Sequence, residues 1–238
     1  MQAGGTMGRA EAGARAVDLR LYGLLDTGVS GGDGAVLARL GAEAVAGGCT
    51  LLQYREKDIT DARATLERLR AIHVAIGGQV PLLVNDRVDL ALAAGADGVH
   101  LGQSDMHPSD ARRLLGPQAI IGITVKNAAH ADELYRLPVD YACIGGVFST
   151  TSKDNPDPPV GLDGLSRLLF RARLARGPGL PVGAIAGIGA DNAAQVIAAG
   201  ADGVAVISAL FGAEPVRQSA RHLRGLIDEA LAQRGAAR

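Results

Sequence analysis

The feature that most constrains the fold is an eightfold alternation of short apolar runs with segments of helical periodicity. The apolar runs fall at residues 19–26, 49–55, 81–85, 98–102, 119–124, 141–145, 181–186 and 203–208. Apolar residues recur at helical spacing in residues 34–47, 60–76, 88–94, 109–115, 128–136, 162–175, 191–199 and 215–234. Continuous apolar runs are typical of parallel strands that are buried on both faces. The pattern therefore predicts eight strand–helix units.

Eight such units within about 220 residues predict an α/β fold, a closed (β/α)8 TIM barrel that forms a single domain. A doubly wound open sheet is the alternative. Residues 1–18 are rich in Ala, Gly and Arg and have no apolar segment of the kind a secretory signal needs. We expect a flexible N-terminal tail there, and a catalytic barrel over residues 19–234. The proline-rich residues 155–159 are interpreted as a loop within that domain.

Charge and composition exclude several classes of function. The chain carries 24 Lys and Arg against 25 Asp and Glu, a net charge of −1, so no overall positive field attracts nucleic acid or an anionic membrane. Aromatic residues make up only 3%, which disfavours a base-stacking surface. No apolar run is long enough to span a membrane. Cys49 and Cys143 lie inside apolar runs, and we interpret them as reduced core thiols of a cytoplasmic protein.

One six-residue sequence, Ala-Gly-Ala-Asp-Gly-Val, occurs twice, at residues 94–99 and 199–204. In both copies the first glycine follows a predicted helix, and the Asp-Gly pair precedes a predicted strand. We interpret the repeat as helix–loop–strand chemistry used twice, and not as a repeated functional motif.

Polar side chains gather where the predicted strands end, which in a (β/α)8 barrel is the face that carries the active site. After the second to sixth strands these residues include Gln53, Arg55, Lys57, Asn85, Asp86, Gln103, Asp105, Thr124, Lys126 and 149–153. Three of the cations, Arg55, Lys57 and Lys153, would lie at one rim. Asp86 and Asp105 follow neighbouring strands, and two carboxylates completed by phosphate oxygens and water are typical of Mg²⁺. We therefore predict that Mg²⁺ and a pyrophosphate or nucleotide phosphate bind here.

Each of these residues also has a structural interpretation. Asp86 could cap the helix that begins beside it, and Asp105 could belong to the turn before Pro108. Glu56 is as well explained by a solvated run of charges. The combination of two acids with three cations is what favours the metal site. His100 lies within an apolar run, and we interpret it as a packed or hydrogen-bonded core histidine.

A second anion site is predicted after the seventh and eighth strands. Residues 187–191, Gly-Ile-Gly-Ala-Asp, lead into a short helix, and Ile207 and Ser208 follow the last strand. Loops in these two places, with a helix N-terminus, commonly bind phosphate in such barrels. Plain turn glycines are the alternative. Two phosphate sites indicate a reaction that joins two phosphorylated substrates and releases pyrophosphate. Residues 150–160 form a long polar segment that we predict to act as a lid.

Six segments together resemble the thiamine phosphate synthase family. They are LYGLLD at 21–26, QYREKD at 53–58, PLLVNDRVDLALAAGADGVHLGQSD at 81–105, DYACIGGVFSTTSK at 140–153, PVGAIAGI at 181–188 and GADGVAVISAL at 200–210. The resemblance implies a barrel enzyme that condenses hydroxymethylpyrimidine diphosphate with a thiazole phosphate, giving thiamine phosphate and pyrophosphate. It also implies a dissociative step through a pyrimidine carbocation, in which stabilising the leaving pyrophosphate is the main catalytic demand.

The resemblance also implies roles for individual residues. The pyrimidine diphosphate segment matches Gln53, Tyr54, Arg55, Glu56 and Lys57, and the diphosphate contact matches Asn85. The Mg²⁺ ligands match Asp86 and Asp105. The segment that contacts the thiazole phosphate matches Thr150, Thr151 and Ser152, and the phosphate-binding end matches Gly187, Ile207 and Ser208. Catalytic roles fall to Arg55, Lys57, Lys153 and Thr124, the last of which stands where the family has Ser. Ala186 departs from the family's usual Gly, and Thr150-Thr151-Ser152-Lys153 replaces Thr-Pro-Thr-Lys.

Three other functions are compatible with such a barrel. A thiazole tautomerase, an isomerase on the same fold, would not need the diphosphate residues. A phosphate-binding or regulatory barrel without catalytic activity would not need acids and bases at several strand ends. A sugar-phosphate enzyme would need a poised His or Glu, for which Glu56 is the only candidate. We expect small-molecule substrates as the partners, with no nucleic acid and no membrane, and the sequence leaves a homo-oligomer open.

Overall fold

The strands close into a barrel in the order in which they occur along the chain, and β8 pairs with β1. The computed structural model describes residues 17–150, 158–212 and 215–236. The strands are β1 (Leu21–Asp26), β2 (Leu51–Arg55), β3 (Leu82–Asn85), β4 (Gly98–Leu101), β5 (Ile120–Val125), β6 (Tyr141–Ile144), β7 (Val182–Ile185) and β8 (Val204–Val206). All neighbouring pairs are parallel. The predicted (β/α)8 barrel is confirmed, and the open sheet is excluded.

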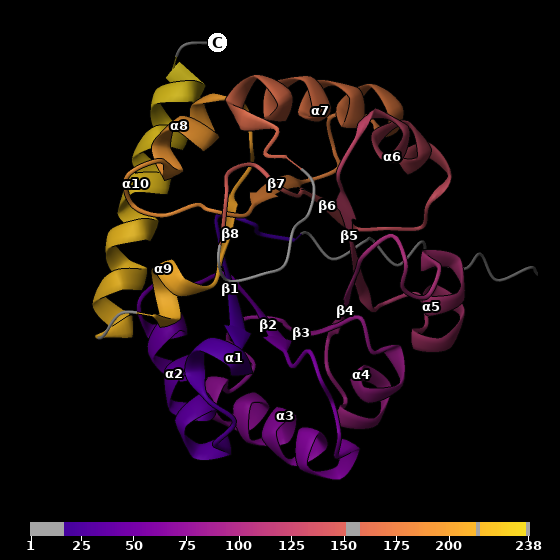
Figure 1. Cartoon of the computed structure of the whole chain (residues 1–238), viewed down its shortest axis with the longest axis vertical. Helices are drawn as coiled ribbons and strands as arrows, with labels where there is room; N and C mark the ends of the chain where they lie inside the picture. The colour runs from indigo at the N-terminus through magenta and orange to yellow at the C-terminus, as the bar shows by residue number, and fades with distance from the viewer. Residues whose placement is uncertain (1–16, 151–157, 213–214, 237–238) are drawn as a thin grey trace, which may run out of the picture.

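Helices surround the barrel, as Figure 1 shows. They are α2 (Gly34–Ala46), α3 (Ala62–Ile76), α4 (Val88–Ala94), α5 (Pro108–Leu115), α6 (Ala128–Glu133), α7 (Gly161–Arg176), α8 (Ala193–Ala198) and α10 (Val216–Ala236). Each corresponds to a predicted helix. The structure adds α1 (Thr27–Ser30) and α9 (Ser208–Phe211), and the last residues of the helix predicted over 128–136 form a 3₁₀ turn (Leu134–Arg136). Elements this short contain too few residues for helical periodicity to reveal them.

Successive side chains along each strand point alternately into the barrel and toward the helices. On β2, Leu51 belongs to the cluster inside the barrel, whereas Leu52 and Tyr54 belong to the cluster between the strands and the helices. By the same alternation Gln53 and Arg55 point inward. The residues of the Gln-Tyr-Arg motif are thus divided between two faces of one strand.

The two ends of the described chain extend a little beyond the predicted domain limits. Val17 is only 8% exposed and packs in the interior cluster with Leu19, and Asp18 binds the Arg20 side chain. Residues 1–16 lie outside the described residues. At the other end α10 continues to Ala236. Among the residues that the structure describes, no helix is both long and apolar enough to cross a membrane.

Both cysteines are buried and unbridged, as the sequence predicts for core thiols. Burial raises the pKa of Cys49 and of Cys143 to about 12. Thiols of this kind are almost wholly protonated near neutral pH and are therefore poor nucleophiles. They belong to the packing of the barrel and not to its chemistry.

The repeated six-residue sequence ties adjacent strands together at their N-terminal ends. The Asp97 carboxylate accepts a hydrogen bond from the Leu82 amide at 2.9 Å, and the Asp202 carboxylate accepts one from the Val182 amide at 2.9 Å. In each case the aspartate joins the start of its own strand to the start of the preceding one. The interpretation of the repeat as fold chemistry is confirmed.

The glycine that follows each aspartate leaves room for the neighbouring backbone. A Cβ at Gly98 would lie 1.8 Å from the Ile120 carbonyl oxygen, and a Cβ at Gly203 would lie 1.7 Å from the Leu19 carbonyl oxygen. A backbone atom in a closed barrel cannot move aside as the end of a flexible side chain can.

We predict that Gly98→Ala lowers the free energy of unfolding by about 3 kcal/mol, because the methyl group overlaps fixed backbone. Urea unfolding followed by circular dichroism measures this. The matched control is Gly225→Ala on α10, where nothing lies within 4 Å of the added Cβ. That change should stabilise the protein by about 1 kcal/mol, since alanine favours a helix interior. Equal effects of the two substitutions would show that the close approach at Gly98 is unimportant.

Candidate active site

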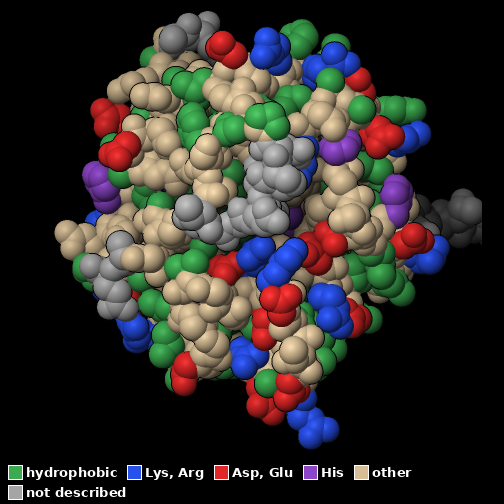
Figure 2. Space-filling model, in the orientation of Figure 1, with side chains coloured by type: hydrophobic (Ala, Val, Ile, Leu, Met, Phe, Trp, Pro, Cys, Tyr) green, Lys and Arg blue, Asp and Glu red, His purple; other side chains and the backbone are tan. Residues whose placement is uncertain are grey.

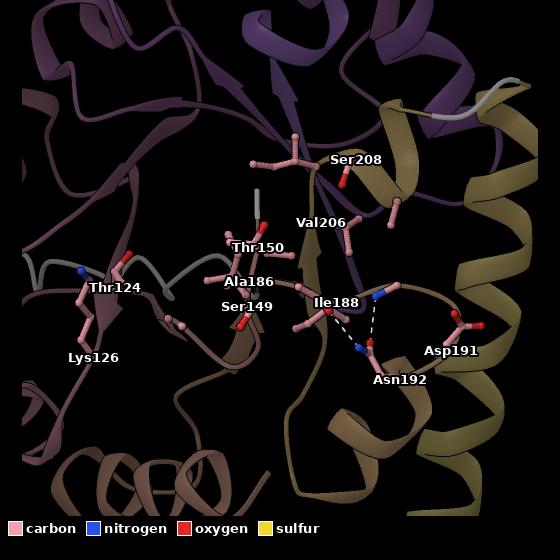
Figure 3. A pocket seen from close by; sticks show the side chains of 18 residues that line it. Thr124, Lys126, Ser149, Thr150, Ala186, Ile188, Asp191, Asn192, Val206 and Ser208 are labelled. Carbon is pink, nitrogen blue, oxygen red and sulfur yellow. Dashed lines mark hydrogen bonds between the residues drawn. The ribbon is translucent and has the colours of Figure 1, made fainter. Parts of the chain in front are cut away.

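One pocket at the C-terminal ends of the strands lies over β5 to β8. We call it the glycine pocket; it has a volume of about 600 Å³. It is lined by Thr124, Lys126, Gly145, Gly146, Ser149, Thr150, residues 185–189, Asp191, Asn192 and residues 205–209. Figure 3 shows Thr124 and Lys126 on one side of the cavity, and Asn192 and Ser208 on the other. The pocket thus brings together the predicted residues Thr124, Thr150, Gly187, Ile207 and Ser208.

The loop between β7 and α8 forms the narrow, glycine-rich wall of this pocket. Gly187 has φ +65°, and a Cβ there would lie 2.4 Å from the Ser149 carbonyl oxygen, so a larger residue would not fit. Asn192 closes the loop: its amide oxygen accepts a hydrogen bond from the Gly189 N–H at 2.9 Å, and its amide nitrogen donates one to the Gly187 carbonyl at 2.9 Å (Figure 3). Asn192 was not predicted from the sequence. Its one signal is an Asn that follows a glycine-rich turn by a few residues.

The second pocket lies at the ends of β2 and β3, and we call it the Lys57 pocket. It has a volume of about 430 Å³ and is lined by residues 56–60 and 85–87. It therefore gathers Glu56, Lys57, Asn85 and Asp86 from the predicted site. Figure 2 shows Lys and Arg side chains interleaved with Asp and Glu near the centre of the face in view, so charge at this end is balanced locally.

Asp86 has a backbone conformation that is rare for a residue with a side chain. Its φ is +60°, and the Arg87 N–H donates to the Asn85 carbonyl across it at 2.6 Å, which closes a three-residue turn. The Asp86 N–H itself donates to the His100 carbonyl at 2.9 Å. The capping position of α4 is Arg87, with no side-chain cap, so the helix-cap interpretation of Asp86 is wrong. Strain of this kind at a pocket indicates a functional constraint.

Tyr54 and Glu56 form a structural cluster against α3. The Tyr54 hydroxyl donates to a Glu56 carboxylate oxygen at 2.6 Å, Thr65 donates to the same oxygen at 2.6 Å, and Arg68 donates to the other at 3.0 Å. Burial and the Glu56 carboxylate raise the pKa of Tyr54. Tyr54 lines neither pocket, because alternation along β2 turns it toward the helices. Glu56 lines the Lys57 pocket but is engaged in these bonds, so it is not a solvated charge.

Arg55 forms an ion pair with Asp26 inside the end of the barrel. The two residues are 7% and 4% exposed, and the Asp26 carboxylate also accepts a hydrogen bond from the Gly28 N–H at 2.8 Å. Removing one partner of such a pair leaves the other charge buried and unpaired, which destabilises the fold by about 3–5 kcal/mol. Asp26 therefore holds the Arg55 guanidinium in place. This partner was not predicted from the sequence, since Asp26 lies 29 residues away and ends an apolar run.

The remaining residues singled out from the sequence differ in how far the structure describes them. Gln53 lies inside the barrel and lines neither pocket; its amide donates to the Tyr22 hydroxyl. Thr151, Ser152 and Lys153, and with them most of the predicted lid at 150–160, lie outside the described residues. His100 is 8% exposed and bonded to Tyr141 and Thr124, which confirms its interpretation as a hydrogen-bonded core histidine.

Asp86 and Asp105 offer carboxylate oxygens, the type of donor that Mg²⁺ prefers. The two carboxylates follow the neighbouring strands β3 and β4. One oxygen of Asp105 accepts a hydrogen bond from the Gly102 N–H at 2.7 Å, the turn contact given as its alternative, and a carboxylate has a second oxygen to offer. Within the described residues no three His, Cys, Asp or Glu side chains are grouped to hold an ion. Phosphate and water would therefore complete the shell, as is usual for Mg²⁺.

A family model described as thiamine monophosphate synthase matches residues 21–210, which span every strand and both pockets. The chain belongs to this family. Two curated relatives, both named thiamine-phosphate synthase, extend the match over nearly the full length. The protein of Agrobacterium fabrum is 54% identical over 220 residues, covering 92% of this chain and 98% of its own. That of Chloroflexus aurantiacus is 42% identical over 216 residues, covering 90% and 95%.

A solved structure of the family has the same fold. The thiamine phosphate pyrophosphorylase from Pyrococcus furiosus superposes with a TM-score of 0.77 at 34% sequence identity, covering 91% of this chain and 98% of its own. The family thus accounts for the barrel.

The departure from the family pattern at Ala186 carries backbone strain. Ala186 has φ +93°, a region that glycine enters freely and other residues rarely adopt. Its carbonyl accepts a hydrogen bond from the Phe148 N–H at 3.1 Å, which helps to fix this conformation.

We predict that Ala186→Gly raises the free energy of unfolding by about 1 kcal/mol, because it removes the strain of a positive φ. Chemical unfolding measures the change. The same substitution two residues earlier, at Ala184 in the middle of β7, is the control. There it should destabilise by about 1 kcal/mol or more, since a buried methyl group is lost and glycine weakens a strand. Destabilisation at both positions would contradict the strain at Ala186.

Proposed function

We propose that the chain is a transferase that condenses 4-amino-2-methyl-5-hydroxymethylpyrimidine diphosphate with a thiazole phosphate or its carboxylate, giving thiamine phosphate and pyrophosphate, together with CO2 where the carboxylate is the substrate. The observation that carries this is the pair of pockets at one end of the barrel in a member of the thiamine monophosphate synthase family. One pocket offers backbone donors and glycines to a phosphate. The other combines Lys57 and Asn85 with the strained Asp86. An isomerase or a single-phosphate binding protein would have no use for both.

In this proposal the thiazole phosphate occupies the glycine pocket. The backbone at 187–188 and the start of α9 at Ser208 border this pocket, and Gly187 lets an anion approach the main chain closely. Thr124 and Thr150 line the same cavity with hydroxyl groups. Because Asn192 fixes the loop before any ligand arrives, little ordering remains to be done on binding.

The diphosphate would lie toward the Lys57 pocket and the buried end of Arg55. The bond between the pyrimidine methylene and the diphosphate oxygen breaks, and its electron pair leaves with pyrophosphate. The thiazole nitrogen then donates its lone pair to the methylene carbon, forming the new C–N bond. Fixed cations near the leaving group stabilise the negative charge that develops on it, and such electrostatic stabilisation usually contributes most to catalysis. Lys57 and Arg55 are suited to this, and the resemblance adds Lys153.

Asp86 and Asp105 would hold Mg²⁺ in the complex. The ion, when bound, neutralises part of the diphosphate charge. The chain's own contribution is to present the Asp86 carboxylate from a three-residue turn anchored to the His100 carbonyl. Contacts to substrate by Gln53, Tyr54, Glu56, Thr151 and Ser152 stay predictions, as do a cytoplasmic location and a homo-oligomer.

The proposal predicts that the purified protein releases pyrophosphate only when both precursors and Mg²⁺ are present. A coupled phosphate assay with inorganic pyrophosphatase measures release, and chromatography identifies thiamine phosphate. Reactions that lack one precursor are the controls. Release that is no faster than background in the complete mixture would overturn the synthase assignment, and conversion of the thiazole alone would favour the tautomerase.

Asp86→Asn tests the metal site at the level of one atom. Asparagine tolerates a positive φ, so the turn should survive while one anionic ligand is lost. We expect the Mg²⁺ concentration for half-maximal rate to rise at least about tenfold, since even outer-shell partners of a metal are worth about 10–100-fold. Asp89→Asn is the matched control: Asp89 lies three residues on, is exposed, and pairs with Arg87. An unchanged magnesium dependence in Asp86→Asn would remove Asp86 from the metal site.

A further inference from the structure

Five polar side chains from five strands form one continuous chain of hydrogen bonds through the interior of the barrel. In order they are Gln53, Tyr22, Tyr141, His100 and Thr124. The Gln53 amide nitrogen donates to the Tyr22 hydroxyl, and the two tyrosine hydroxyls are 2.9 Å apart. The Tyr141 hydroxyl is 2.8 Å from His100 Nδ1, and His100 Nε2 is 2.9 Å from the Thr124 hydroxyl. None of the five residues is more than 8% exposed.

Packing around the rings fixes the order of these contacts. The Tyr22 and Tyr141 rings meet edge to face, with centroids 5.9 Å apart and planes at 84°. His100 lies 5.5 Å from Tyr141 between ring centroids. Gly122 on β5 makes room for this arrangement, because a Cβ there would lie 2.0 Å from Tyr141 Cζ. With the rings held in this way, each hydroxyl keeps the same two neighbours along the chain.

The first member of the chain sets the direction of every hydrogen bond after it. An amide nitrogen can only donate, so the Tyr22 oxygen accepts from Gln53 and its proton goes to Tyr141. Tyr141 in turn donates to His100 Nδ1. A neutral imidazole that accepts at Nδ1 carries its proton on Nε2, from which it donates to the Thr124 oxygen. The Thr124 hydroxyl proton then points onward, out of the chain.

Two observations support this direction against the reverse one. The reverse requires the Gln53 amide to turn over, which would bury its NH₂ group without the Tyr22 partner. In the structure it is instead Gln53 Oε1 that is buried without a partner, and an unpaired carbonyl is the cheaper of the two. Burial also raises the pKa of Tyr22 and of Tyr141, so both phenols keep the protons that the chain needs.

We propose that Gln53 is a positioning residue that acts through this chain to make the Thr124 hydroxyl a hydrogen-bond donor toward the glycine pocket. Thr124 lines that pocket (Figure 3), and a donor there stabilises an anionic substrate oxygen. With the chain reversed, Thr124 would turn its lone pairs to the same oxygen and repel it. The resemblance to the family implies that Gln53 contacts the substrate directly. In this proposal Gln53 acts on the substrate indirectly, through four successive hydrogen bonds. The expected effect on the reaction rate rests on the proposed function. The prediction of which His100 nitrogen carries the proton does not.

The protonated nitrogen can be observed directly by long-range ¹H–¹⁵N NMR of the imidazole side chains in the full-length protein. The chain has five histidines, and a His100→Gln variant identifies the resonances of His100. We expect the wild type to carry the proton on Nε2, with Nδ1 unprotonated. A proton on Nδ1 in the wild type would overturn the proposal, whatever the protein is found to catalyse.

Two variants then interrupt the chain at different links. Gln53→Met removes the donor that sets the direction of the hydrogen bonds. Tyr141→Phe removes the hydroxyl that links Tyr22 to His100. In both, the His100 signals should show a mixture of tautomers. We expect kcat to fall about tenfold, with a smaller change in KM, because a transition-state donor is misdirected and not removed. Either variant tests the idea if the other fails to fold.

Gln103→Met is the matched control. The Gln103 amide donates to the Thr124 backbone carbonyl at 2.6 Å, so the same substitution is made next to the same threonine but outside the chain. It should leave the His100 tautomer as in the wild type. Unchanged tautomer and kcat in Gln53→Met, or an equal tautomer change in Gln103→Met, would show that Gln53 does not set the direction. A wild type without synthase activity but with the Nε2 proton would instead count against the function alone.

Discussion

Pairing of β8 with β1 is the constraint on which the rest of the structure depends. Three residue pairs, from Leu21 with Val204 to Gly23 with Val206, join the first and last strands. Closure removes the free edges that an open sheet of the same strands would present. It also places the C-terminal ends of all eight strands on one face of the barrel. Loops that are distant in sequence therefore line the same pockets. Finally, it divides each strand into residues that face the interior and residues that face the helices.

The interior is where this barrel departs from a simple apolar core. Tyr22, Tyr141, Gln53 and His100 occupy positions that branched aliphatic residues usually fill in such barrels. Buried polar groups are tolerable only when they are paired, and here nearly all of them are bonded to one another. The exception is Gln53 Oε1. The interior thus links the middle of the barrel to its functional face at Thr124, at the cost of one unpaired carbonyl.

The fold was predictable because its signal is repeated eight times and each strand is a continuous apolar run. The positions of the strand-end residues followed from topology alone. What could not be predicted was the direction of each side chain within a contiguous motif. Gln53, Tyr54 and Arg55 are neighbours in sequence, yet only alternate residues of β2 point inward, and a shift of one residue would reverse them.

Side-chain contacts between neighbouring strands could not be predicted from the sequence either. Asp26 pairs with Arg55 because the register places these two residues opposite each other at the ends of β1 and β2. No local pattern encodes that contact. Asn192 was missed for a different reason: its bonds to Gly187 and Gly189 are local, but an Asn beside a glycine-rich turn is too common a pattern to single it out.

Asp86 and Ala186 show how the closed barrel supports its functional face. They are the two residues with side chains that have positive φ in the described chain, and each lines one of the two pockets. Such conformations persist only where surrounding structure determines them. At Asp86 the turn is held by the His100 carbonyl of β4, and at Ala186 the loop is held by the Phe148 amide. In both places a neighbouring segment of the same rim supplies the hydrogen bond. The rigidity of the barrel is therefore what allows two strained turns to persist beside the two pockets at the same end.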